Sequence, residues 1–123
     1  MNKAIAIFLL GAAALNSYAQ LLTGEDKAAF KESLASTCYS AQRYSPINSA
    51  LSNIDIKSYC GCIASKVSDE MTLQALNQYV YDIKTYGKDD ANRFFNESVH
   101  MDRKSKHCIT EWLNRFKELR NIT

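Results

Sequence analysis

Apolar residues recur at steps of three and four along most of the chain, the spacing of one face of an α-helix. The first such segment runs from Thr23 to just before Ser45 and Pro46. Thr23 followed by Asp26 predicts a capping box at its start, and a residue before proline disfavours helix at its end. Its apolar positions are Ala28, Phe30, Leu34, Ala35, Cys38 and Ala41.

Two more helices are expected after a polar linker over residues 45–53. The second covers about residues 55–68 and is weakened by Gly61, and the third starts after Thr72 and stops at Gly87. The predicted apolar faces are Ile56, Tyr59, Cys60, Ile63 and Val67 in the second helix and Leu73, Leu76, Val80 and Ile83 in the third.

The last region opens with Asp89 and Asp90, whose charges suit a helix N-terminus. Two apolar patches follow on either side of the polar stretch 102–107, and the pattern does not decide between one long helix and two. With no alternating strand pattern, the chain is predicted to be all-α, with four or five helices. The two patches are Ala91, Phe94, Phe95 and Val99, and Cys108, Ile109, Trp112, Leu113, Phe116 and Leu119.

Residues 1–19 have the organisation of a cleaved signal peptide. Lys3 precedes an apolar run over residues 4–15, and Ser17 and Ala19 stand at the small-residue positions of a cleavage site. The run is shorter than the ~20 residues that span a bilayer. We therefore expect a mature domain over residues 20–123, periplasmic or secreted, without a membrane span.

Length and charge narrow the possible functions. The 123 residues, less the leader, make one small domain, and the net charge of +2 at pH 7 is low for a nucleic-acid binder. No nucleophile elbow, phosphate-binding glycine loop or His-Glu-x-x-His motif is present. The sequence predicts a protein without catalytic residues, metal or cofactor, and with no nucleic-acid partner.

Four cysteines in an exported domain predict two disulfides. Cys60 and Cys62 are two residues apart, so on a helix they point about 200° apart, to opposite flanks. A bond between them would be strained, which leaves each to pair with either Cys38 or Cys108. Pairing Cys38 with Cys60 and Cys62 with Cys108 is favoured because it includes the shorter loop. Each bridge would stabilise the fold by about 3 to 4 kcal/mol.

Two chemical alternatives use the same residues. Cys60 and Cys62 could exchange disulfides with other thiols, although no thioredoxin-like pattern surrounds them. Together with Cys108 and His107 they could instead carry a metal, although the spacing is not that of known zinc sites.

A second set of polar residues falls at helical spacing near the C-terminus. His100, His107 and Glu111 could hold zinc if the last region is one helix, but an ion pair between His107 and Glu111 on a solvated face is favoured. A solvated turn is expected for Arg103, Lys104 and Lys106.

A surface contact patch is predicted in the third helix. Tyr79 and Tyr81 are two residues apart and cannot both face the core. Because tyrosine is enriched at protein interfaces, we expect Tyr81, Asp82 and Lys84 to form a binding surface.

The run Tyr59-Cys60-Gly61-Cys62-Ile63-Ala64, followed by Thr72, the Leu73 and Leu76 stripe and a distant Cys108, resembles a broad set of small exported bacterial helical proteins with a Tyr-Cys-x-Cys motif. More distantly it is similar to periplasmic immunity proteins that neutralise type VI secretion effectors. The resemblance implies a binding protein of immunity or inhibitor type, with an envelope or secreted protein as its partner.

Overall fold

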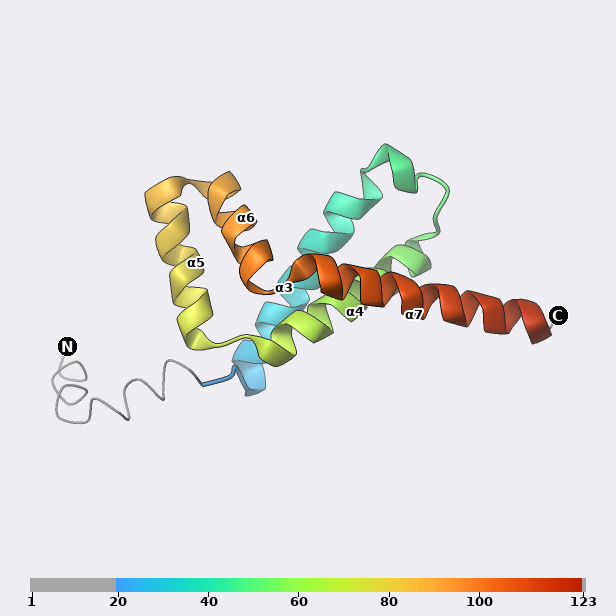
Figure 1. The fold of residues 1–123 in the computed structure, drawn as a ribbon, viewed down its shortest axis with the longest axis horizontal. Coiled ribbons are helices and arrows are strands. Elements are labelled where there is room, and N and C mark those ends of the chain that lie inside the picture. The colour runs from blue at the N-terminus through green and yellow to red at the C-terminus, as the bar shows by residue number, and fades with distance from the viewer. Residues whose placement is uncertain (1–19, 123) are drawn as a thin grey trace, which may run out of the picture.

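The computed structural model describes residues 20–122, so the predicted leader over residues 1–19 lies outside the described part. Five α-helices and one short 3-10 helix make up this part (Figure 1). Two disulfides join the helices, which confirms the predicted all-α, disulfide-linked fold. The elements are α3 (Gly24–Arg43), η1 (Pro46–Asn48), α4 (Asn53–Glu70), α5 (Leu73–Tyr86), α6 (Lys88–Ser98) and α7 (Met101–Ile122).

Helix α4 is the centre of the fold. It packs against both α3 and α7, whereas α5 packs against α6 as a separate hairpin (Figure 1). Helix α4 supplies six buried residues, and α3 supplies none. The buried residues of α4 follow the predicted three- and four-residue spacing: Ile56, Cys60, Ile63, Ala64, Val67 and Ser68.

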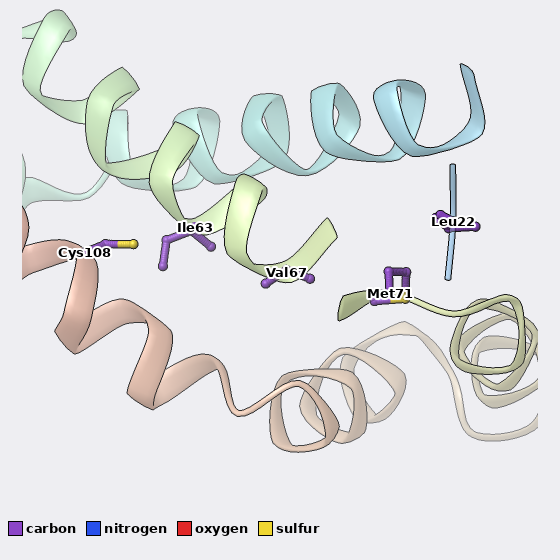
Figure 2. Packing of buried hydrophobic residues seen from close by; sticks show 5 residues of the cluster. All are labelled: Leu22, Ile63, Val67, Met71 and Cys108. Atoms are coloured by element: carbon purple, nitrogen blue, oxygen red, sulfur yellow. The ribbon is translucent and has the colours of Figure 1, made fainter. Parts of the chain in front are cut away.

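The hydrophobic core follows α4 to its C-terminal end. Ile63 and Val67 of α4 lie beside Cys108 of α7, and the row continues through Met71 to Leu22 (Figure 2). The backbone N–H of Leu22 donates to the carbonyl oxygen of Met71 at 2.9 Å. The segment before α3 is therefore part of the packed domain.

Side-chain caps start two of the helices. The hydroxyl of Ser52 accepts from the backbone N–H of Asp55, and the hydroxyl of Thr72 accepts from that of Ala75, each at 3.1 Å. The capping box expected at Thr23 is wrong, because its side chain makes no capping hydrogen bond. Gly24 has a φ of 56° at this point, so the first turn does not adopt the geometry that a capping box needs.

The predicted core stripe of α5 is only partly correct, because Leu76 packs against the hydrophobic core while the other three members are exposed. Leu73, Val80 and Ile83 are 41%, 48% and 37% exposed, respectively. Because α5 packs against α6, the side that it buries is the one that faces that helix, and this side carries Tyr79 and Asp82.

The last region consists of two helices with a break at Val99 and His100. His100 has a φ of 54°, a left-handed conformation that interrupts the helix. The polar stretch 102–107, expected between the two apolar patches, lies inside α7. The break falls before it.

Candidate functional site

Two disulfides hold α4 from opposite flanks. Cys38 of α3 is bonded to Cys60, and Cys62 is bonded to Cys108 of α7, with Cα–Cα distances of 5.6 and 5.8 Å. This is the favoured one of the two predicted pairings. The Cys-Gly-Cys triplet therefore links three helices.

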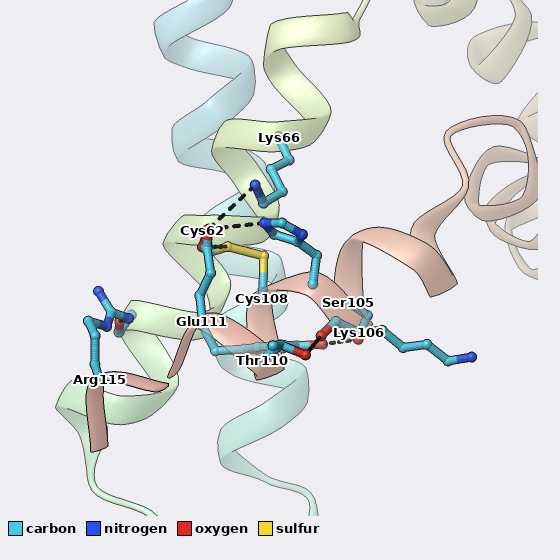
Figure 3. The surroundings of a disulfide bond; sticks show 11 residues. Cys62, Lys66, Ser105, Lys106, Cys108, Thr110, Glu111 and Arg115 are labelled. Carbon is cyan, nitrogen blue, oxygen red and sulfur yellow. Dashed lines mark hydrogen bonds and ion pairs between the residues drawn. A yellow bond between two sulfur atoms is a disulfide. The ribbon is translucent and has the colours of Figure 1, made fainter. Parts of the chain in front are cut away.

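The Cys62–Cys108 bond is bordered by charged side chains (Figure 3). Oε1 of Glu111 lies 3.1 Å from Nε2 of His107 and 3.8 Å from Nζ of Lys66. Its Oε2 lies 3.4 Å from Sγ of Cys62. The side chains next to this disulfide are therefore one carboxylate, one ammonium group and one imidazole, which contact each other.

The arrangement around His107 bears on the metal alternative. His107 and Glu111 form the predicted pair on α7, while His100 lies outside that helix at the break. Among the described residues no three His, Cys, Asp or Glu side chains come together at distances that suit a metal ion. In the oxidised protein the cysteine sulfurs are bonded to each other and offer no thiolate ligand.

Lys104 is buried, which corrects the solvated turn expected there. Its ammonium group donates to Oε1 of Glu70 at 3.0 Å and to the carbonyl oxygen of Val99 at 2.6 Å. It thus joins the ends of α4 and α6 to α7. The sequence contains a signal for this position, because Lys104 precedes Cys108 by four residues and so shares its helix face.

Asp55 connects the start of α4 to α7. Nε1 of Trp112 donates to its Oδ1 at 3.0 Å, and the hydroxyl of Ser52 donates to its Oδ2 at 2.8 Å. The hydrogen bond from Trp112, followed by that from Ser52, holds the pKa of the Asp55 carboxyl below its usual value. The carboxylate therefore stabilises this end of the fold while it is ionised.

The three residues of the predicted contact patch do not all lie on the same side of α5. Tyr81 is 56% exposed and Lys84 is exposed, but Asp82 is 6% exposed and accepts from Nε2 of Gln78 at 2.9 Å. Asp82 faces α6 and is not available on the same surface. Tyr81 and Lys84 keep the position that the sequence predicts.

Tyr81 and Lys84 belong to a larger exposed surface, which we call the α5 outer face. It points away from α6, and its members recur at three, four and seven residues. Two of its aliphatic residues, Leu73 and Val80, belong to the stripe predicted for the core. The α5 outer face consists of Leu73, Asn77, Val80, Tyr81 and Lys84.

Comparison with known proteins gave no match, neither to a family model nor to a curated protein nor to a solved structure. Over residues 20–122, none of the helices combines the length and the apolar character needed to cross a membrane.

Proposed function

We propose that the protein is an exported, non-catalytic interaction protein, which binds another envelope or secreted protein through the α5 outer face. The observation that carries this proposal is the exposure of Leu73, Val80 and Tyr81 on one side of a helix. An apolar patch on the surface of a small domain is typical of a protein-binding site.

The chemistry of the α5 outer face supports a protein partner. Tyr81 offers a large apolar ring with a hydroxyl, a combination enriched at protein interfaces. Lys84 and Asn77 lie beside it as polar neighbours, in the manner of a polar rim around an apolar centre. The resemblance to periplasmic immunity proteins suggests that the partner is a toxin-like effector and that binding inhibits it.

The scaffold supports binding by a preformed surface. The two disulfides hold α3 and α7 to α4, and Lys104 holds α6 to the end of α4. A preformed surface loses less conformational entropy on association than a mobile one.

The test compares two exposed aliphatic residues changed to the same charged residue. Val80→Glu places a charge in the α5 outer face, and Ile54→Glu places one at the start of α4, where Ile54 is 79% exposed. We expect the oxidised wild-type protein and Ile54→Glu to capture the same protein from an envelope extract. Val80→Glu should weaken binding of that purified partner by about tenfold or more. Equal affinity of the two variants, or no specific partner, would contradict the proposal.

The redox and metal-carrier alternatives remain predictions with their own measurements. A thiol oxidoreductase would reduce insulin in the presence of a dithiol, with Cys60 or Cys62 cycling between redox states. A metal carrier would retain zinc or copper by elemental analysis after purification without chelator.

A further inference from the structure

A groove separate from the α5 outer face opens between α3 and the α5–α6 hairpin. In Figure 1 these two parts diverge on either side of the place where α7 begins. The groove has a volume of about 520 Å³ and is lined by residues of all five helices. This is within the range of roughly 300–1,000 Å³ that is typical of small-molecule sites.

Apolar side chains from four helices form part of the walls of the groove. Phe30 and Leu34 come from α3, Ile63 from α4, Phe95 from α6 and Met101 from α7. All of these except the buried Ile63 are only partly buried and pack against the hydrophobic core. A hydrocarbon body placed here would cover apolar surface that is still accessible to water.

The lining of the groove carries no formal charge. The chain has 15 Lys and Arg and 13 Asp and Glu residues, yet the groove is lined by apolar, hydroxyl and amide side chains alone. An ionised ligand would lose hydration without finding a countercharge, which is unfavourable. A lining without charged side chains is therefore suited to a neutral molecule.

A few polar groups lie within the groove. The Tyr79 hydroxyl donates to Oδ1 of Asn92 at 2.5 Å, which leaves the Asn92 NH₂ group able to donate elsewhere. Asn96 lies one turn further along α6 and is exposed. Both amides can donate to a carbonyl or hydroxyl oxygen of a ligand.

The groove is elongated along α3. On α3 it runs from Phe30 to Gln42, a distance of about 18 Å at 1.5 Å per residue. An elongated groove without charged lining residues suits a hydrocarbon chain with a small neutral head better than a charged ligand.

We propose that this groove binds a small, uncharged lipid-like molecule, with its hydrocarbon chain against Phe30, Leu34 and Phe95 and its carbonyl or hydroxyl head at Asn92 and Asn96. The site goes beyond the proposed function, because it lies on another surface than the α5 outer face.

The test uses two probes that share one ring system. N-phenyl-1-naphthylamine is neutral, and 8-anilinonaphthalene-1-sulfonate is its anionic analogue. We expect saturable fluorescence enhancement with the neutral probe, about tenfold weaker binding of the sulfonate, and displacement of the neutral probe by 1-monododecanoylglycerol. The dodecanoate ion should displace it about tenfold less well.

Two serines of α3 provide matched variants. Ser33 lines the groove, Ser36 does not, and both are exposed, so Ser33→Trp fills the groove while Ser36→Trp adds the same bulk elsewhere. Ser33→Trp should weaken the neutral probe about tenfold, and Ser36→Trp should leave its affinity within about twofold. Thr37→Phe is a second filling variant, and circular dichroism and the disulfide map check the fold of each.

Several outcomes would overturn this assignment. They are no saturable binding to the wild-type protein, equal affinity for the neutral and anionic probes, or unchanged affinity in both filling variants. A dimer that dissociates on Ser33→Trp would assign the groove to a second copy of the chain instead. Val80→Glu should bind the probe normally, so the loss of one site is distinguishable from the loss of the other.

Discussion

The ammonium group of Lys104 lies 2.6 Å from the carbonyl oxygen of Val99, at the point where α6 ends. Since Val99 is among the last residues before α7, its carbonyl has no helical partner and accepts from the buried lysine instead. The same ammonium group holds Glu70, so one side chain joins three helices.

Lys104→Met should lower the free energy of unfolding by about 1 to 3 kcal/mol, because it removes hydrogen bonds from a charged donor and leaves the Val99 carbonyl without a partner. Lys106→Met, at an exposed position of the same helix, should change it by less than about 0.5 kcal/mol. Urea unfolding at neutral pH measures both. Similar stabilities for the two variants would show that Lys104 does not hold the break.

Removing either disulfide should cost a large part of the stability. The Cys38–Cys60 and Cys62–Cys108 bonds close loops with sequence separations of 22 and 46 residues. Replacing both partners of one bridge with alanine should lower the free energy of unfolding by about 3 to 4 kcal/mol. Peptide mapping of the oxidised protein checks the pairing, and four free thiols or a Cys60–Cys62 bond would contradict it.

The hydrogen bonds to the Asp55 carboxylate should make the free energy of unfolding depend on pH in the acid range. The pKa of Asp55 is lower in the folded than in the unfolded chain, so its contribution is present above the unfolded pKa and is lost as pH falls through the folded pKa. Asp55→Asn should therefore make stability fall less steeply between about pH 5 and pH 2. Unfolding midpoints across this range measure the effect, with Asp102→Asn, at an exposed carboxylate of α7, as the control. An unchanged slope in Asp55→Asn would rule out this contribution.

Two glycines should respond to alanine in opposite directions. Gly87 has a φ of 91° at the turn between α5 and α6, so Gly87→Ala should destabilise the fold by about 1 to 3 kcal/mol. Gly61 lies inside α4 with open space around an added methyl group, so Gly61→Ala should stabilise it by about 0.5 to 1 kcal/mol. Thermal melting of the two variants compares them directly, and a loss of stability in Gly61→Ala would contradict the helix-propensity argument.

The local features of the chain were predictable where they depend on helical geometry. The spacing of Cys60 and Cys62 places them on opposite flanks of a helix, so the pairing was reduced to two possibilities before any neighbour was known. Thr72 and Gly87 mark the ends of α5 as predicted, because a cap and a left-handed turn depend on a few adjacent residues.

The candidate sites were less predictable because they depend on neighbouring helices. Asp82 was expected beside Tyr81 on the surface, but it faces α6 and bonds to Gln78. Lys104 was expected in solvent, but the ends of two other helices surround its ammonium group. Lys104 lies only five residues after Val99, but its hydrogen bond to that carbonyl oxygen requires the break between α6 and α7, which the apolar pattern did not locate.

The sequence by itself determined that the chain is helical, where most helices begin and end, and that its cysteines link the second predicted helix to others. Only the tertiary structure decided which side of α5 is covered, where the C-terminal region breaks, and that a groove remains open along α3. Helical periodicity is a property of short-range backbone geometry. Burial depends instead on which other element packs against a helix, and an amphipathic stripe does not specify that element.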